Sequence, residues 1–388
     1  MSRYSDLGNA LYTGERSIPV VPQRKLFYLG SAVLLVVAVL GLLIPKLNLG
    51  MEFTGGSEFR VSGAANTSDF ETKAREAVGG EGRTVNSTLL GTGTVRVQTE
   101  RLTGTESESA RSSLASSFGV TSTQVSATFI GPSWGASVSR QALSALLWFL
   151  ALVAIVMALY FRTWKMSLAA LIALVHDLVI TAGIYAWTGF EVSPATMIGF
   201  LTVLGYSLYD TVVVFDKVRE NTAEAFANGR LSFADAANLA VNQTMVRSIN
   251  TTVVAILPVL AILIIGVVKL GAGTLLDLSL VLFVGIIVGA YSSIFIATPL
   301  LVSLRSSEEG VAELAKKAER HQARVAKAAR QAEAVPVSAG HVGSETVSGD
   351  DSPVVATGEG QTLTGRAVHK YAASGPRNQP KRTPKSRR

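Results

Sequence analysis

The stretch GYSLYDTVVVFDKVREN, residues 205–221, contains two aspartates in different surroundings. Asp216 begins a charged run that includes Lys217, whereas Asp210 is followed by five uncharged residues and lies at the end of an apolar stretch that starts near residue 195. A carboxylate in such a position needs an explanation. The explanation depends on whether water or lipid surrounds residue 210.

The composition indicates a membrane protein. The chain has 388 residues, of which 48% are hydrophobic and only 16% charged, and its mean hydropathy is positive. It contains no cysteine, which excludes disulfides, thiolate metal sites and cysteine nucleophiles. Nothing in the sequence predicts a cofactor or a metal ion.

Six apolar runs are long enough to cross a bilayer, which takes roughly 20 residues as a helix. They lie near residues 27–45, 143–161, 166–187, 195–215, 250–269 and 275–303. The first run is longer than the core of a signal peptide, and no small-residue cleavage site follows it. We therefore interpret it as a retained anchor helix.

The loop charges predict the orientation of these helices. Three short segments are rich in basic residues, and the positive-inside rule places them in the cytoplasm: Arg16, Arg24 and Lys25; Arg162 and Lys165; Lys217, Arg219, Arg230 and Arg247. The opposite loops, residues 188–194 and 269–273, are poor in Lys and Arg. We expect a multi-pass protein of the cell membrane with both termini in the cytoplasm.

Residues 47–140 are then external, and their pattern is that of a small folded domain. The alternation in SEFRVSG predicts a strand, TSDFETKAREAVGG a helix, TVNSTLL and VRVQTE a hairpin, residues 104–118 a second helix, and TSTQVSATFIG a last strand. This β-α-β-β-α-β order is that of the ferredoxin-like split motif. The predicted fold is thus an α-helical bundle of six transmembrane helices with a small α+β, ferredoxin-like external domain between the first two.

The sequence divides into five parts: a cytoplasmic segment 1–26, helix 27–46, the external domain 47–140, helices 2–6 in 141–304, and a basic tail 305–388. Residues 305–330 are charged and alanine-rich and could extend the sixth helix, whereas the rest of the tail has a composition typical of disorder. Its basic end PRNQPKRTPKSRR either solubilises the chain or contacts anionic lipid or ribosomal RNA. No aromatic residues alternate with these charges, so we predict no specific nucleic-acid partner.

In a membrane helix, Asp210 would be costly. If Asp216 marks the cytoplasmic interface, Asp210 lies roughly 9 Å inside it, and a charged Asp at a helix centre costs about 2.5 to 3.5 kcal/mol. Such a residue faces the bundle interior and is protonated or has a partner. Arg247, predicted to open the fifth helix, and the pair His176 and Asp177 in LIALVHDLVITAG are the candidates.

Each candidate also has a structural interpretation. Arg247 near a helix end can reach the headgroups and act as an orientation anchor. His176 and Asp177 can form a buried polar pair that fixes helix packing, and Asp210 can be an interfacial residue if the helix ends earlier than predicted. Against the last alternative, residues 212–215 continue the apolar run.

Small and polar residues near these charges indicate close helix packing. The sixth helix contains a GxxxG pattern, Gly285 and Gly289, followed by Ser292 and Ser293. The fifth helix begins RSINTTVV, whose hydroxyl and amide groups could bond across helices or hold water. Beside an inward carboxylate, these residues could line a hydrated proton path.

Several of these motifs together resemble the SecF family of bacterial protein-export membrane proteins. They are MEFTGGSEF, LVHDLVITAG, GYSLYDTVVVFDKVREN, VNQTMVRSINTT and GAYSSIFIATPLL, in order from about residue 27 to 303. The resemblance implies membership of the resistance-nodulation-division superfamily and use of the proton motive force. It also implies partnership with SecD, with the SecYEG channel and SecA motor, and with exported unfolded preproteins.

The resemblance also implies residue roles. The family's proton-pathway aspartate corresponds to Asp210 and its functional arginine to Arg247. Two positions depart from the family pattern: Tyr209 replaces an asparagine and Glu52 an aspartate. The first departure puts the hydrogen bonding of Asp210 in question and leaves the carboxylate in place.

The sequence therefore predicts an accessory subunit of protein export, not an enzyme. Two other classes stay open. An intramembrane aspartyl protease would need a second catalytic motif, GxGD, which is absent. A small-molecule or lipid exporter of the same superfamily would use the same relay, although such exporters usually carry two six-helix halves in one chain.

Overall fold

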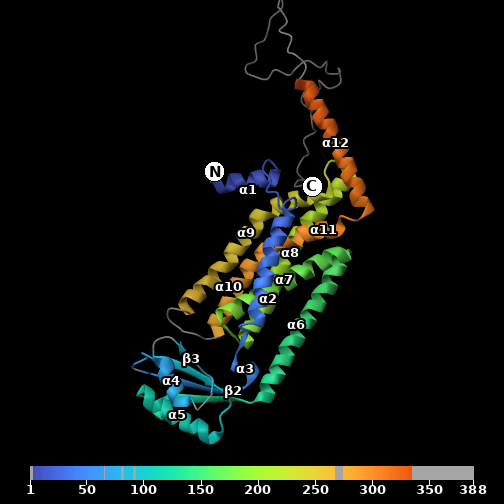
Figure 1. Ribbon diagram of the computed structural model, residues 1–388. Helices are drawn as coiled ribbons and strands as arrows, with labels where there is room; N and C mark the ends of the chain where they lie inside the picture. The colour runs from blue at the N-terminus through green and yellow to red at the C-terminus, as the bar shows by residue number, and fades with distance from the viewer. Residues whose placement is uncertain (1–2, 65, 80–82, 91–92, 267–273, 334–388) are drawn as a thin grey trace, which may run out of the picture. The chain divides into compact units, whose positions relative to one another are not determined.

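A computed structural model describes residues 3–64, 66–79, 83–90, 93–266 and 274–333. The predicted loop at 269–273 and most of the predicted tail lie outside these residues. Within the described ranges, six helical spans are long and apolar enough to cross a membrane: α2 (Arg24–Leu43), α6 (Pro132–Phe161), α7 (Trp164–Thr188), α8 (Pro194–Asn228), α9 (Phe233–Ile265) and the combined span Leu275–Arg305. The helices lie side by side, with a small sheet at one end of the bundle (Figure 1).

Three helices extend well beyond the predicted apolar runs. Helix α6 begins 11 residues before residue 143, with Pro132 in its first turn. Helix α8 continues past Asp216 to Asn228, and α9 begins at Phe233 and not near residue 250. An apolar run ends at the first charged residues. The helix itself continues through them, because its backbone hydrogen bonds do not depend on how apolar the side chains are. Asp216 and Arg247 are therefore mid-helix residues.

The turn between α8 and α9 is short and capped on both sides. Gly229 ends α8 with a φ of 65°, a conformation that favours glycine. The hydroxyl of Ser232 accepts a hydrogen bond from the backbone N–H of Asp235 at 3.1 Å and begins α9. The two helices consequently run antiparallel and pack along their length, which brings residue 210 beside residue 248.

The last span is interrupted by a π-helical turn. Helix α10 (Thr274–Ser292) is followed by η3 (Ser293–Ala297), a π-helix, and then by α11 (Thr298–Arg305). Pro299 lies in the first turn of α11 and has no backbone N–H to donate to the preceding turn, so the wider turn accommodates it. As a result, Ser292 and Ser293 are both fully buried although they are adjacent in sequence.

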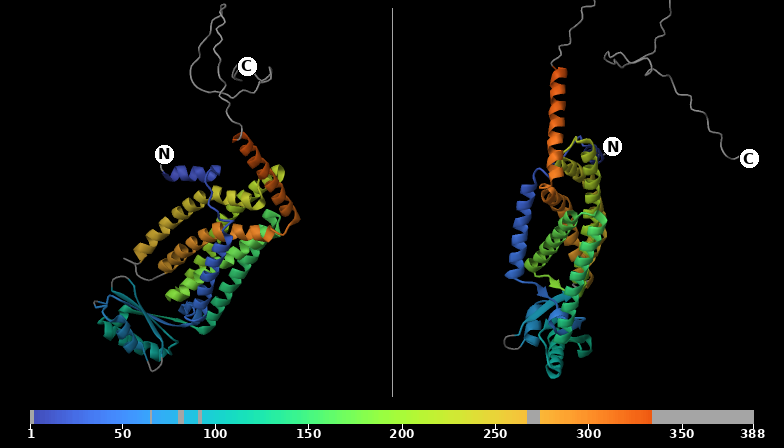
Figure 2. Two further views of the ribbon diagram at one scale, coloured as in Figure 1. Left: turned by 45° about the horizontal axis from the view of Figure 1, so that its top comes forward. Right: turned by 90° about the vertical axis from the view of Figure 1, so that its right-hand side faces the viewer.

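The segment between α2 and α6 contains the predicted order of strands and helices. It comprises β1 (Asn48–Leu49), α3 (Met51–Thr54), β2 (Gly56–Ser62), α4 (Phe70–Val78), β3 (Val85–Leu90), β4 (Thr94–Thr99), α5 (Gly104–Phe118), η1 (Ser122–Gln124) and β5 (Val125–Ile130). Strands β2 to β5 form an antiparallel sheet in the order β3-β4-β2-β5. Helices α4 and α5 cover one face of it, as the two further views show (Figure 2).

Alternation along the strands gives the sheet one apolar and one polar face. Phe59 of β2 and Val97 of β4 are completely buried under α4 and α5. Their neighbours Arg60 and Gln98 point to the opposite face. A two-residue parallel bridge between β1 and β6 (Glu191–Val192) ties the start of this region to the loop between α7 and α8.

Two further helices lie at the other end of the bundle. Helix α1 (Arg3–Thr13) precedes a segment that is clamped to α9, because the side chains of Asn238 and Asn242 accept hydrogen bonds from the backbone N–H groups of Val21 and Ile18. The amphipathic helix α12 (Glu309–Glu333) follows α11 after a break.

Helix α12 lies in the charged, alanine-rich part of the tail that, from its sequence, could extend the sixth helix. Residues 309–333 form α12 as a separate helix and not as a continuation of the sixth span. At the break, the Arg305 guanidinium donates to Glu308, and this bond holds the pKa of that carboxyl below its usual range. Val311, Leu314 and Ala318 are buried along one side of α12, and the first two belong to the core that includes α9. This apolar side explains why the segment is ordered.

Candidate functional site

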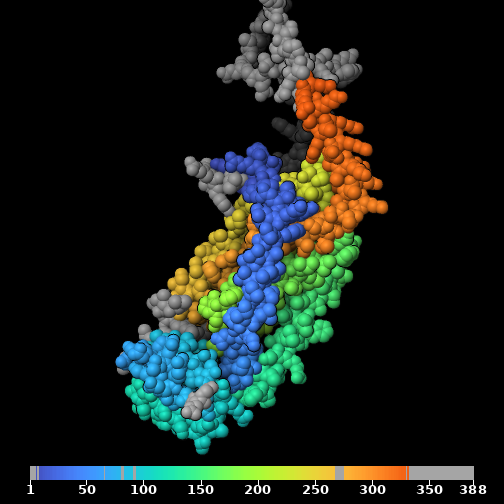
Figure 3. Space-filling model, in the orientation of Figure 1, coloured from blue at the N-terminus to red at the C-terminus, as the bar shows by residue number. Residues whose placement is uncertain are grey.

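The buried polar side chains of the bundle gather on its central helices. About half of the residues in the apolar parts of α7, α8 and the last span are buried. The apolar parts of α2 and α6 are mostly exposed (Figure 3). The buried polar residues in the middle of these helices are His176, Asp177, Thr181, Ser207, Asp210, Thr211, Ser292 and Ser293, with Ser248 on α9. Buried polar groups in an apolar surrounding must be hydrogen-bonded, and most of these are.

Asp177 on α7 is completely buried and bonded on both oxygens. Its Oδ2 accepts hydrogen bonds from the hydroxyls of Ser207 on α8, at 2.6 Å, and Ser292 on α10, at 2.7 Å. Its Oδ1 lies 3.1 Å from Nδ1 of His176. Three helices therefore meet at one carboxylate.

His176 extends this cluster toward α2. Its Nε2 lies 2.5 Å from the hydroxyl of Ser31, and both side chains are buried. In the tautomer whose Nδ1–H donates to Asp177, Nε2 accepts a hydrogen bond from the Ser31 hydroxyl. Hydrogen bonds from Ser31 to His176 and on to Asp177 thus link α2 to the centre of the bundle.

Small residues on α10 allow the helices to approach closely. A Cβ atom placed on Gly289 would lie 2.9 Å from Cβ of Ser207, and one on Gly285 would lie 2.5 Å from Cγ1 of Val203. Real Cβ atoms do not approach so closely, so α10 can pack against α8 in this way only with glycine at these positions. The approach is what brings Ser292 within reach of Asp177.

Asp210 on α8 is also buried, but only one of its oxygens is bonded. Its Oδ1 accepts a hydrogen bond from the hydroxyl of Ser248 on α9 at 2.7 Å. Its Oδ2 is buried and has no hydrogen-bond partner among the residues that the structure describes. Asp210 therefore retains an open acceptor position, whereas both oxygens of Asp177 are occupied.

Arg247 does not form the expected ion pair with Asp210. Its Nη2 lies 3.4 Å from the hydroxyl of Tyr209, both side chains are exposed, and none of the ion pairs within the described ranges joins Arg247 to Asp210. The reason is helical geometry: Ser248, the next residue on α9, faces α8 and occupies the place beside the carboxylate. The guanidinium therefore contacts the hydroxyl of Tyr209 and not the carboxylate.

A row of hydroxyl groups lies between the two carboxylates. The hydroxyl of Ser293, the first residue of the π-helix, lies 2.9 Å from that of Thr211, which follows Asp210. The same Ser293 hydroxyl donates to the main-chain oxygen of Ser207 at 3.3 Å, and Ser207 donates to Asp177. The two carboxylate clusters are therefore neighbours, connected partly through side chains and partly through the α8 backbone.

Asp216, six residues after Asp210, has a different environment. Its Oδ2 accepts a hydrogen bond from the Tyr160 hydroxyl at 2.8 Å at an exposed site. Asp216 makes no contact with either buried cluster through a described hydrogen bond.

The chemistry available here is proton binding and transfer. Two carboxylates, an imidazole and several hydroxyls share a buried region, and each can accept or donate a proton. Within the described part of the chain, no group of three or more His, Asp and Glu residues could hold a metal ion.

The sequence pattern missed three residues of this arrangement, Ser31, Ser207 and Thr211. Each is a hydroxyl residue within an apolar run, which in a membrane helix signals a bond to a neighbouring helix. That signal identifies the residue type, but it does not identify the partner, because the partner depends on how the helices are rotated.

Comparison with known proteins places the chain in a family. The model of the family described as "Protein export membrane protein SecD/SecF, C-terminal" matches residues 110–307. The chain is 44% identical over 319 residues to the protein translocase subunit SecF of Streptomyces coelicolor, covering 82% of this chain and 84% of that one. It is 39% identical over 366 residues to SecF of Mycobacterium tuberculosis, covering 92% and 79%.

Solved structures agree with this assignment. The crystal structure of SecDF from Thermus thermophilus, described as a translocon-associated membrane protein, matches with a TM-score of 0.65 and 29% identity, covering 75% of this chain. The chain spans 39% of that longer protein. A second SecDF structure, in a super-membrane-facing form, matches with a TM-score of 0.57 and 26% identity. With its six apolar spans, this membrane protein belongs to the SecF family of protein translocase subunits.

Proposed function

We propose that the protein acts with SecD to use the proton motive force for late steps of protein export across the cytoplasmic membrane. The observation that carries the proposal is the pair of buried carboxylates, Asp177 and Asp210, on adjacent helices at the centre of the bundle. Ionisable residues buried in membrane helices mark ion and proton paths. One charge that crosses 100 mV supplies about 2.3 kcal/mol, which is enough to bias the direction of a helix movement.

Asp210 is the proton carrier in this proposal. When charged, its carboxylate only accepts hydrogen bonds, and the Ser248 hydroxyl satisfies one oxygen. When protonated, it becomes a donor and the charge is gone, so the contact with α9 is weakened. Arg247, one residue from Ser248, supplies the counter-charge when its guanidinium turns from Tyr209 toward the open oxygen of Asp210.

His176 and Asp177 form the second part of the path. The link from Asp177 through His176 to Ser31 joins the proton-binding region to α2. Helix α2 is followed directly by β1 and the external sheet, and α6 leaves the last strand of that sheet. A change in the bundle is therefore transmitted to the external domain through its two tethers. Gly285, Gly289, Ser292 and Ser293 keep the helices close enough for this coupling.

The partners and orientation belong to the same proposal. The curated SecDF relative from Thermus thermophilus, 32% identical over 299 residues, supports SecD as a partner, because its name joins SecD and SecF. SecYEG, SecA and unfolded preproteins are the further proposed partners. Both termini lie in the cytoplasm, and the external domain is ferredoxin-like, which its strand order and antiparallel pairing support. We propose no enzymatic activity.

The first test compares two aspartates on one helix. Asp210→Asn keeps the shape of the side chain and removes the proton-carrying group, so export driven by the proton motive force should be lost at normal protein levels. Asp216→Asn, at the exposed site beside Tyr160, is the matched control and should support export. If Asp210→Asn exports as well as the parent, the proton-carrier role is wrong.

The orientation has its own test, because the chain contains no cysteine. Ser107→Cys in the external domain should react with an impermeant maleimide in intact cells, and Asn228→Cys at the end of α8 should not. The reverse pattern would place the sheet on the cytoplasmic side.

A further inference from the structure

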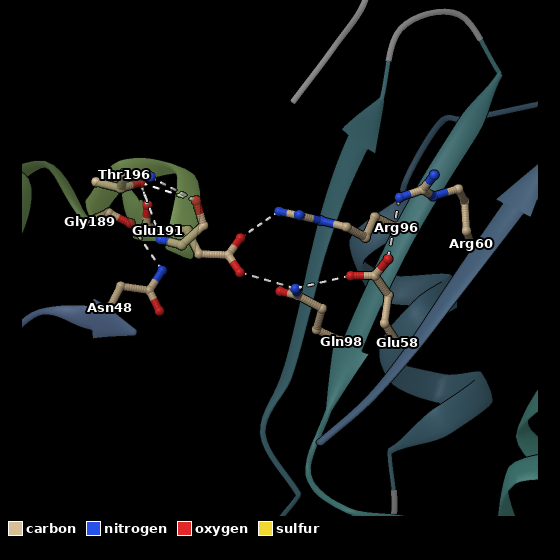
Figure 4. Close-up of polar contacts among 9 residues, drawn as sticks. Asn48, Glu58, Arg60, Arg96, Gln98, Gly189, Glu191 and Thr196 are labelled. Carbon is tan, nitrogen blue, oxygen red and sulfur yellow. Dashed lines mark hydrogen bonds and ion pairs between the residues drawn. The ribbon is translucent and has the colours of Figure 1, made fainter. Parts of the chain in front are cut away.

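The polar face of the sheet carries a contact to the membrane bundle. Arg96 and Gln98 of β4 alternate with the fully buried Val95 and Val97, so they point away from the core under α4 and α5. Figure 4 shows both side chains extending to Glu191, in the loop between α7 and α8. Residues about 95 positions apart are joined here.

The contact is compact and mostly shielded from water. Arg96 Nη2 lies 2.5 Å from Glu191 Oε2, and each side chain is only 14% exposed. The Gln98 amide donates to Glu191 Oε1 at 3.1 Å and to Glu58 Oε2 at 3.3 Å. Removal of one partner from such a pair leaves a poorly solvated charge, which is costly.

Glu191 is held firmly on the bundle side. It pairs with Asn48 in the short β1–β6 bridge, and its main-chain oxygen accepts a hydrogen bond from the Thr196 hydroxyl at 3.4 Å. The Asn48 amide donates to Gly189 at 3.1 Å. These backbone contacts hold the Glu191 carboxylate in a position that the side chains of β4 can reach.

The surroundings of the contact are rich in negative charge. Glu52 on α3, Glu58 on β2, Glu191 and Asp277 on α10 interact electrostatically around Arg96. Burial raises the pKa of Glu52, and the neighbouring Glu191 and Glu58 raise it further, while Arg96 lowers it. Arg96 therefore offsets repulsion among carboxylates that belong to both the sheet and the bundle.

A second arginine on the same face provides a natural comparison. Arg60 of β2 lies opposite Arg96 in the sheet register. It pairs with Glu58 of its own strand at 3.4 Å, and its side chain is 53% exposed. Two arginines thus occupy the same face, but only Arg96 forms an ion pair with the bundle.

We propose that Arg96, Gln98 and Glu191 form a clasp that seats the external domain on the outer end of the bundle and that opens when the domain moves away. The clasp is the point where movement of α7 and α8 reaches the sheet, because Glu191 lies in the loop that joins them. It adds a side-chain connection to the two covalent tethers and the β1–β6 bridge. The inference does not depend on proton coupling.

The test measures opening directly. A cavity of about 440 Å³ beside the clasp is lined by residues of both sides, including Thr88 of β3, Glu191 and Asp277. In the full-length protein in lipid nanodiscs, Thr88→Cys should react slowly with a maleimide while the clasp is closed. Both sides of a nanodisc are open to the reagent, so the result does not depend on orientation.

Adding Arg96→Gln or Glu191→Gln should speed this labelling at least about tenfold, because breaking a buried pair is costly. Adding Arg60→Gln, the matched control, should leave the rate unchanged. The charge-swapped pair Arg96→Glu with Glu191→Arg should return the rate toward that of the parent. Ala115→Cys, at a buried position of α5 in the core under the sheet, reports on folding and should react equally slowly in all backgrounds.

Two outcomes would overturn the clasp. One is an unchanged labelling rate in Arg96→Gln, and the other is an equal acceleration by Arg60→Gln. If Arg96→Gln also speeds labelling at Ala115→Cys, the charge-swapped protein decides: slow labelling at Thr88→Cys supports the clasp, and fast labelling contradicts it.

Discussion

The apolar parts of helix α9 and of the last span are equally hydrophobic. Yet only 11% of these residues are buried in α9, whereas 50% are buried in the last span. The apolar part of α9 presents Val253, Val254 and Leu257 to the outside. The last span packs Gly285 and Gly289 against α8. Hydropathy thus shows that a helix can enter a membrane, while small residues and hydroxyls show which helices form the centre.

The strongest expected effect concerns that close packing. Gly289→Leu should disrupt assembly of the bundle, because even a Cβ atom placed at this position would lie 2.9 Å from Cβ of Ser207. Overpacking costs typically about 1 to 3 kcal/mol, and here it also separates Ser292 from Asp177. The measurement is the midpoint of thermal unfolding in detergent.

Gly30→Leu on the peripheral helix α2 is the control, because a Cβ there meets nothing within 4 Å. Its unfolding midpoint should stay close to that of the parent. Equal destabilisation by both substitutions would erase the distinction between central and peripheral helices.

The next effect tests the buried hydroxyls. Ser292→Ala removes one of the two hydroxyls that donate to Asp177 Oδ2 and should cost about 1 to 3 kcal/mol, with reduced export. Thr202→Ala on α8 is the control, since its exposed hydroxyl donates only to the carbonyl of its own helix. A Ser292→Ala protein as stable and active as Thr202→Ala would show that the Asp177 cluster is not coupled to function.

A smaller effect is expected in the domain between α2 and α6, where the polar contact of Glu106 is exposed. Glu106 caps α5 by accepting hydrogen bonds from the Thr103 N–H and hydroxyl and from Arg83, and these bonds lower its pKa from 4.5 to about 2. Because the folded-state pKa is depressed, the stabilisation is present above pH 4.5 and is lost as the pH falls toward 2.

Glu106→Gln should therefore speed amide hydrogen exchange at the start of α5 near neutral pH, compared at equal intrinsic exchange rate. The difference from the parent should shrink as the pH is lowered to about 3. Glu108→Gln, whose side chain is 72% exposed, is the control. A difference that grows on acidification contradicts the capping role.

The smallest effect is predicted on the outer face of α9. Val254 is 68% exposed in the isolated chain, so Val254→Ala should change the unfolding midpoint in detergent very little. A large destabilisation there would mean that burial does not separate the two kinds of helix.

Much of the architecture could be predicted from local pattern. The six spans follow from the length of apolar runs, and the β-α-β-β-α-β order from alternation and glycine turns. The end of α8 and the start of α9 could not be predicted, because both helices continue through charged residues that water accommodates. The helical character of residues 309–333 was anticipated, but their separation from the sixth span was not, because it depends on the break at residues 306–308.

The site was only partly predictable for a related reason. A carboxylate such as Asp210 in an apolar run stands out by its energetic cost, and so do His176 and Asp177. The partner of Asp210 depends on helix rotation: Ser248 and Arg247 are adjacent on α9, yet only Ser248 faces the carboxylate. The clasp was missed because the partner of Arg96 lies in a distant loop.

The most direct test of the account measures protons during export. Inverted membrane vesicles that contain the protein with SecD and the Sec channel should show proton movement coupled to the late, ATP-independent stage of preprotein translocation. Asp210→Asn should abolish that coupled movement and leave the ATP-driven early stage intact, while Asp216→Asn should preserve both. Coupled proton movement of normal size in Asp210→Asn would contradict the central role of the buried carboxylate.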